Sequence, residues 1–301
     1  MAATASQIRT MRGASPGSAR GLGRSLAMAA NNPRFLFALT VFLLVVAFGF
    51  LGPIILARPE PLITVGGLYD APSSTAWLGT DNFGRDVFTQ LMYGCRTSLI
   101  IGFIAGTVAT LIGLTIGTIA GFIGGTLEEG LMAVTNVVIT IPSIVILILL
   151  SLAIPVRSIA VMGFIIGITS WPWTARAVRA QSSSLRTREH VDVARLSGAG
   201  TVSLIIAEII PFMASYVVMA FVLQVSSGIL QETALSLLGL GPSGSISLGI
   251  MLQWALLWES VRTGAWWAFI PPALLLTLIV FSLLLLQSSI DEIFNPRLRS
   301  N

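Results

Sequence analysis

Long stretches without a charged residue dominate the pattern of this chain. A membrane-spanning helix needs about 20 predominantly apolar residues, and a charge at its centre costs roughly 2.5 to 3.5 kcal/mol. The following intervals between successive charges are long enough to form such helices: 35–57, 97–127, 130–156, 158–175, 209–231, 233–258 and 263–290. The pattern therefore predicts a bundle of helices that lies in lipid.

One of these intervals, 233–258, does not suit a helix in lipid. Its middle, residues 239–249, is rich in glycine and serine and contains a proline. Such a segment would leave backbone hydrogen-bonding groups without partners in hydrocarbon. We therefore predict an external re-entrant segment over 232–262, within an all-α membrane protein of six transmembrane helices.

The basic residues predict the orientation of these helices. The 17 basic residues are all arginines, and basic residues are enriched on the cytoplasmic side of membrane proteins. One side of the predicted topology holds most of them: Arg9, Arg12, Arg20, Arg24, Arg34, Arg176, Arg179, Arg186, Arg188, Arg195, Arg297 and Arg299. Both termini and the connection 176–208 are therefore predicted to be cytoplasmic, in a multi-pass protein of the cytoplasmic (inner) membrane.

Composition supports this class of protein and argues against others. Hydrophobic residues make up 54% of the chain and charged residues 10%, and the mean hydropathy is +0.88. A soluble domain of this length rarely has such a balance. The basic pI of about 10.2 reflects the arginines that set the topology, so no nucleic-acid partner is predicted.

The predicted organisation has four parts. Residues 1–34 form a cytoplasmic N-terminal tail, and 35–96 contain the first transmembrane helix and an external segment. Residues 97–290 form a core of five transmembrane helices, and 291–301 form a cytoplasmic C-terminal tail. Helical spacing of apolar residues also predicts a helix over 86–96 that leads into the second span.

Two of the transmembrane helices carry residues that predict their packing. The second span has small residues four positions apart, which allow close approach of helix backbones in lipid: Gly102, Gly106, Gly113, Gly117 and Gly121. We expect this helix to be central. In the third span, Pro142 removes a backbone donor and predicts a kink. Asn136 and Ser143 of that span either bond to neighbouring helices or line a pathway.

No catalytic site, metal site or cofactor is predicted. A P-loop requires lysine, which the chain lacks, so an ATP-driven motor would have to be a separate chain. The sequence has one histidine, His190, and one cysteine, Cys95, without HExxH or GxSxG spacing. The spans as defined by charge spacing contain no ionisable residue, which disfavours an ion-coupled secondary carrier.

The connection 176–208 is the best candidate for contact with such a partner chain. It is predicted to contain a short helix that offers apolar contacts at Val191, Ala194 and Leu196 and ends before Gly198 and Gly200. This helix could occupy a cleft on another protein. Its arginines suit a position on anionic membrane lipid equally well.

Four segments resemble the permeases of ATP-binding cassette (ABC) importers. The run at 189–199, followed by Ile209-Ile210-Pro211, resembles their cytoplasmic EAA loop, with Asp192, Val193 and Ala194 in place of Glu-Ala-Ala. Glu208 stands where that family commonly has an apolar residue. The segments 77–87, 232–241 and 291–299 resemble the C-type subunit of the dipeptide, oligopeptide and nickel permeases.

This resemblance implies the type I ABC importer permease fold and several partner chains. They are a second homologous permease in a heterodimer, two ATP-binding cassette ATPases and an external solute-binding protein. The loop 188–200 would dock on an ATPase, and the residues expected to transmit the coupling are Arg188, Glu189, Asp192, Ala194, Arg195 and Gly198. The chain would carry no ATP site and no enzymatic activity of its own.

Di- or oligopeptides are the favoured substrates within this family, because a wide, mostly uncharged passage tolerates varied side chains. Polar residues of the fifth span are expected to line it: Gln224, Ser226, Ser227 and Gln231. Nickel or another chelated metal is the alternative substrate.

Overall fold

The computed structural model of the chain describes residues 32–58 and 60–294, so most of both predicted tails lies outside the described residues. The elements in chain order are α3 (Pro33–Phe50), α4 (Gly52–Ile55), α5 (Val87–Ile123), α6 (Gly125–Thr140), α7 (Ser143–Ala153), α8 (Ile159–Arg186), α9 (Glu189–Leu196), α10 (Thr201–Leu204), a π-helical turn (Ile205–Ile209), α11 (Ile210–Phe212), α12 (Ala214–Leu237), α13 (Leu248–Leu257) and α14 (Trp266–Phe294). The all-α prediction is confirmed: in these ranges, β pairing is limited to isolated bridges.

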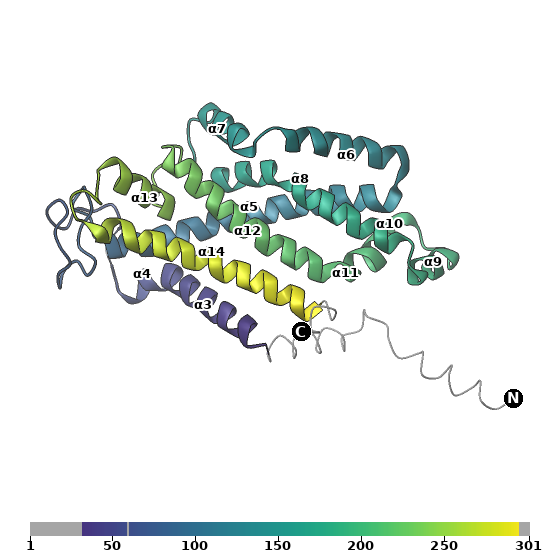
Figure 1. Ribbon diagram of the computed structural model, residues 1–301, viewed down its shortest axis with the longest axis horizontal. Coiled ribbons are helices and arrows are strands. Elements are labelled where there is room, and N and C mark those ends of the chain that lie inside the picture. Colours follow the sequence, from purple (N-terminus) through teal and green to yellow (C-terminus); the bar gives the residue numbers. More distant parts are fainter. Residues whose placement is uncertain (1–31, 59, 295–301) are drawn as a thin grey trace.

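The long helices lie roughly side by side, and short elements gather at the two ends of the bundle (Figure 1). One end carries α13 and the irregular segment that follows α4, and the opposite end carries α9 and α10. α3 and α14 pack against each other on one edge, whereas the pair α6 and α7 forms the opposite edge. The irregular segment and the α9 connection therefore lie at opposite ends, as a spanning bundle requires.

Four of the described helices are long and apolar enough to cross a membrane: α3, α5, α12 and α14. The pair α6 and α7 would be a fifth span, bent by 81° at the break between them. That break contains Pro142, so the predicted kink is confirmed. α8 is long but carries Arg176, Arg179 and Arg186 in its second half, and its place as a sixth span remains a prediction.

α5 is the central helix, as its glycines predict. A Cβ atom on Gly102 or Gly106 would collide with Ile229 or Val225 of α12. A Cβ atom on Gly113 would collide with Thr174 of α8, and Gly117 and Gly121 also face that helix at close range. One row of small residues therefore packs α5 tightly on two neighbours at successive levels of the bundle.

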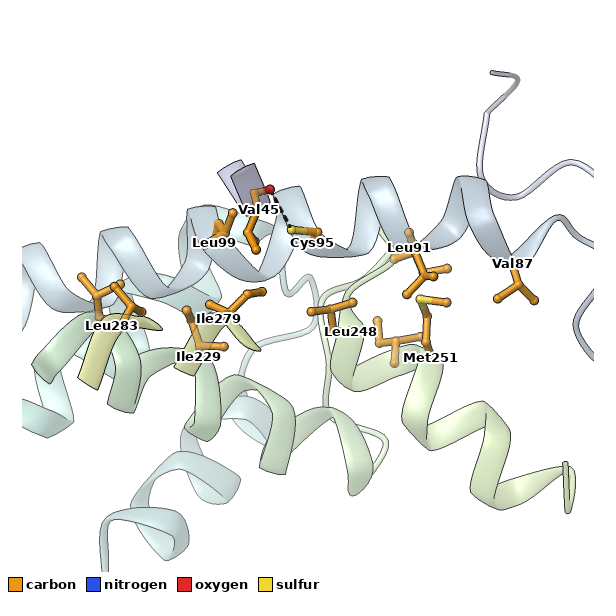
Figure 2. Packing of buried hydrophobic residues seen from close by; sticks show 13 residues of the cluster. Val45, Val87, Leu91, Cys95, Leu99, Ile229, Leu248, Met251, Ile279 and Leu283 are labelled. Carbon is orange, nitrogen blue, oxygen red and sulfur yellow. Dashed lines mark hydrogen bonds between the residues drawn. The ribbon is translucent and has the colours of Figure 1, made fainter. Parts of the chain in front are cut away.

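The packed interior at one end of the bundle joins α5 to α3, α12, α13 and α14. Its largest apolar cluster includes Val45, Leu91, Ile229, Met251 and Ile279. Figure 2 shows Leu248 and Met251 of α13 against the same stretch of α5 as Leu91 and Cys95. α13 is therefore an integral part of the core and does not lie loosely on the surface.

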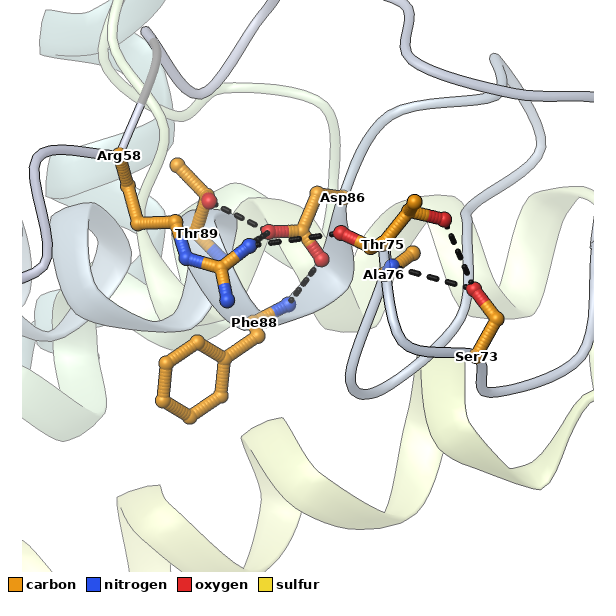
Figure 3. Close-up of polar contacts among 7 residues, drawn as sticks. All are labelled: Arg58, Ser73, Thr75, Ala76, Asp86, Phe88 and Thr89. Atoms are coloured by element: carbon orange, nitrogen blue, oxygen red, sulfur yellow. Dashed lines mark hydrogen bonds and ion pairs between the residues drawn. The ribbon is translucent and has the colours of Figure 1, made fainter.

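The helix predicted over 86–96 is confirmed as the first turns of α5. Asp86 is the N-cap: its carboxylate accepts hydrogen bonds from the backbone N–H groups of Phe88 and Thr89, at 3.3 and 3.1 Å. The guanidinium of Arg58 lies 3.5 Å from the same carboxylate (Figure 3). Asp86 thus anchors both the longest helix and the irregular segment before it.

Asp86→Ala is expected to lower the free energy of unfolding by about 1 to 2 kcal/mol, because N-cap removal typically costs that much. Thermal unfolding of the purified chain in detergent would measure the change. Glu60→Ala is the matched control, since Glu60 is an exposed acidic residue of the same segment. Equal effects of the two substitutions would contradict the capping role.

One expectation about charge was wrong. α12 continues beyond residue 231 to Leu237, so this candidate span contains an ionisable residue, Glu232. Its side chain is completely buried. The argument against an ion-coupled carrier that relied on uncharged spans therefore loses its basis.

Candidate functional site

The charged side chains within the short helix α9 are placed where they interact favourably with the helix dipole. Arg188 is the N-cap, Glu189 and Asp192 lie in the first turn and Arg195 lies in the last. Acidic groups near a helix N-terminus and basic groups near its C-terminus are stabilising. Asp192 and Arg195 also form an exposed ion pair at 3.1 Å, so their charged groups lie on the outer surface of α9.

The end of α9 is a Schellman motif centred on Gly198. The backbone N–H of Gly198 donates to the carbonyl of Arg195 at 3.0 Å, and that of Ala199 donates to the carbonyl of Ala194 at 3.1 Å. Gly198 has a φ of 88°, a left-handed conformation that favours glycine. The predicted break at Gly198 is therefore present, and it fixes where α9 stops.

The apolar residues of α9 divide between two faces, which corrects part of the prediction. Val191 is fully buried and Ala194 packs beside it, so these two side chains contact the rest of the chain. Of the three residues expected to offer contacts to a partner, Val191 has no exposed surface, Ala194 is half-buried and Leu196 has 89% of its surface exposed. Val193, which was not expected there, joins it on the exposed face.

The inner face of α9 connects it to the long helices. Val191 belongs to a buried cluster with Phe122 of α5, Val178 of α8 and Met213, which precedes α12. Glu208, on the π-helical turn beside this cluster, is half-buried. α9 therefore shares a buried apolar cluster with residues of α5 and α8 and with the residue before α12.

A pocket of about 560 Å³ opens between α6, α7, α8 and α12. Four of the predicted pathway residues line it, namely Ser143, Gln224, Ser227 and Gln231. The other contributors include residues that sequence reasoning did not single out: Thr169, Ser170, Trp173, Thr174, Tyr216 and Leu223. Most of these come from α8, where a Ser-Trp-Pro-Trp-Thr run beside apolar residues was the available signal.

The polar groups of the pocket are joined by hydrogen bonds between α8 and α12. The side-chain amide of Gln231 donates to the hydroxyl oxygens of Ser170 and Ser227, at 3.1 and 2.9 Å. The amide of Gln224 donates to the hydroxyl of Thr174 at 2.7 Å and to the backbone carbonyl of Ser170 at 3.0 Å. These contacts hold two glutamine side chains at the wall of a pocket whose lining, in the described part of the chain, contains no charged residue.

Two other candidate residues do not belong to the pocket. The side-chain oxygen of Asn136 accepts hydrogen bonds from Arg176 at 3.1 and 2.6 Å, so Asn136 joins α6 to α8 outside the lining. This arrangement matches the helix-packing alternative considered for Asn136. Ser226 is buried on another side of α12.

Comparison with known proteins places this architecture in a family. Residues 113–300 match the model of the binding-protein-dependent transport system inner membrane component. A putative peptide permease protein of Brucella suis biovar 1 is 32% identical over 300 residues, covering 99% of this chain and 98% of that protein. The dipeptide transport system permease protein DppC of Bacillus subtilis is 30% identical over 229 residues, covering 76% of this chain and 71% of that protein.

A third relative extends the comparison to another genus. The oligopeptide transport system permease protein OppC of Mycobacterium bovis is 28% identical over 238 residues, covering 77% of this chain and 80% of that protein. The family match includes α8, α9, α12 and α14, which supply most of the pocket and the whole α9 connection. The chain is thus a multi-pass membrane protein that belongs to the binding-protein-dependent transport system inner membrane component family.

Proposed function

We propose that this chain is a permease subunit of an ATP-driven importer for di- or oligopeptides in the cytoplasmic membrane. It would form a heterodimer with a second, homologous permease and work with two ATP-binding cassette ATPases and an external solute-binding protein. The observation that carries the proposal is the neutral pocket between α8 and α12, found in a chain whose relatives are named as peptide permeases.

The pocket is suited to a substrate whose side chains vary. Its lining combines apolar residues with amide and hydroxyl groups. The N–H groups of Gln224 and Gln231 are used within the wall, so these side chains offer carbonyl oxygens as acceptors. Such groups hydrogen-bond to peptide backbone amides whatever the side chains are. The passage would be completed by the corresponding face of the second permease.

The coupling to ATP hydrolysis would pass through α9. Its outer face would present Val193, Leu196 and the Asp192–Arg195 pair to a cleft on the ATPase, while Val191 on its inner face belongs to the buried cluster that includes residues of α5 and α8. A short element packed on both sides transmits rigid-body motion. Movement of the ATPases would then move α8 and α12, which form two walls of the pocket.

Reconstitution of the full importer in liposomes tests this function. We expect ATP-dependent uptake of labelled di- or oligopeptides that requires the binding protein. Uptake of nickel but not of peptide would contradict the peptide assignment and identify a metal as the substrate. Uptake that needs an ion gradient but no ATP would contradict the importer mechanism.

Gln231→Leu is expected to reduce peptide uptake in that system by about tenfold. The substitution removes a hydrogen bond between the neutral side-chain amide and the peptide, which contributes about 1.4 kcal/mol. Binding of the ATPases should not change, since Gln231 lies near the C-terminal end of α12, whereas α9 lies at the end of the bundle where α12 begins (Figure 1). Gln181→Leu is the control. Gln181 is a glutamine of α8, the other helix that lines the pocket, but its side chain is exposed and lies outside the pocket. Equal losses for both substitutions would argue against a pathway role.

A further inference from the structure

The most deeply buried carboxylate of the described helices is not used by the pocket or by α9. Glu232 lies on α12, next in sequence to the pocket residue Gln231, and its side chain has 0% exposure. A buried carboxylate is costly unless hydrogen bonds compensate it. The partners of Glu232 therefore indicate what it does.

Three serine hydroxyls from three parts of the chain donate to this carboxylate. Ser236 and Ser247 donate to Oε1, both at 2.6 Å, and Ser98 donates to Oε2 at 3.1 Å. Ser98 belongs to α5, Ser236 lies one turn along α12, and Ser247 is the N-cap of α13. One side chain thus joins three helices.

The same serines continue the connection to the start of α13. The backbone N–H of Leu248 donates to the hydroxyl oxygen of Ser98 at 3.2 Å, and that of Ile250 donates to Ser247 at 3.1 Å. Backbones approach closely here, because a Cβ atom on Gly94 would lie 3.3 Å from the nitrogen of Leu248. Oriented bonds in such a tight contact fix the position of α13 on α5.

We infer that Glu232 is a positioning residue that pins α13 to α5 and α12. Because of these hydrogen bonds, α13 and the face of α12 that lines the pocket move as one rigid body. Gln231 therefore keeps its orientation toward α8. Glu232 lies in the segment 232–241, which resembles peptide permeases. Neither the pocket nor α9 explains that resemblance. This inference rests on the proposed function only where peptide uptake is measured, because the labelling experiment does not depend on transport.

Accessibility of a buried position on α13 tests the pin independently of transport. Cys95 is the sole cysteine, so Cys95→Ala gives a background for Met251→Cys, a position with 3% exposure on the face of α13 toward α5. A polar maleimide applied to membranes that contain the full importer should label this cysteine slowly. Leu257→Cys, at an exposed position of α13, should label quickly in every variant.

Glu232→Leu is expected to increase the labelling rate at position 251 by about tenfold, since α13 opens more often once its bonds are lost. Glu232→Gln should restore a slow rate, because the amide keeps an acceptor for Ser247 and can donate to Ser98. In the transport assay, Glu232→Leu should lower peptide uptake while the ATPases still co-purify.

Two serine substitutions complete the test. Ser98→Ala breaks a bond between helices and should also speed labelling, whereas Ser236→Ala removes a bond of the same carboxylate within α12 and should not. If Glu232→Leu does not accumulate, this serine pair decides the question. An unchanged rate in Ser98→Ala, or equal acceleration in Ser98→Ala and Ser236→Ala, would overturn the inference. Failure of peptide uptake in the wild type would contradict the proposed function and leave the labelling result intact.

Discussion

Leu196→Asp is expected to abolish stable binding of the ATPases while the permease stays folded. Leu196 is the most exposed of the large apolar residues in the described chain, at the last position of α9. The proposed cleft on the ATPase would bury this position, and an unpaired carboxylate placed there costs about 2 kcal/mol or more. The affinity should therefore fall by about 30-fold or more, which co-purification and quantitative binding assays would measure.

Val202→Asp is the matched control for this substitution. Val202 lies on α10, six positions further along the chain, and 69% of its surface is exposed. The same charge is introduced at the same end of the bundle but outside α9, so ATPase binding should persist. If both variants lost the ATPases, general repulsion by the added charge would explain the result. If neither did, α9 would not be the docking element.

Gly117→Leu is expected to prevent normal packing of α5 against α8. A Cβ atom at position 117 would lie 2.5 Å from the backbone carbonyl oxygen of Ala175 and 2.7 Å from the Cβ atom of Val178. A backbone atom cannot move aside as a flexible side chain can, so the two helices would have to separate. We expect a loss of about 3 kcal/mol or more in stability, visible as a lower thermal midpoint and aggregation in detergent.

Gly130→Leu should have the opposite effect, although it is the same substitution within a helix. A Cβ atom on Gly130 of α6 would meet nothing within 4 Å, and leucine has a higher helix propensity than glycine by up to about 1 kcal/mol. A lower midpoint for Gly130→Leu of similar size would show that glycine flexibility, and not close packing, explains the loss at position 117.

The sequence predicted the parts of the fold that follow from local chemistry. Desolvation of charges defines where helices can cross lipid, and this located the apolar stretches of α3, α5, α12 and α14, although it missed the end of α12. The glycine row on α5 and the kink at Pro142 followed from backbone sterics, which neighbouring sequence alone determines. The Schellman motif at Gly198 is another feature of this kind.

Features that depend on contacts between distant segments were less accessible. Charge spacing treats every charged residue as the edge of a span, so it ended the fifth span before Glu232. The serine that meets its Oε2 atom, Ser98, is 134 positions away in sequence. Likewise, Asn136 and Ser143 looked equivalent along the chain, but Asn136 bonds to Arg176 of α8 outside the pocket, whereas Ser143 lines it.

The bend between α6 and α7 gives the pocket a further property. The carbonyl groups in the last turn of a helix have no N–H partners from a following turn, and the last turn of α6 ends beside the pocket at Val138 and Ile139. Pro142 contributes no N–H group of its own. The side chains that α6 contributes at this wall are apolar, and the carbonyl groups of its last turn are the hydrogen-bond acceptors next to them in the chain. Backbone polarity is the same for every residue type, so substitutions of these side chains would leave those acceptors in place.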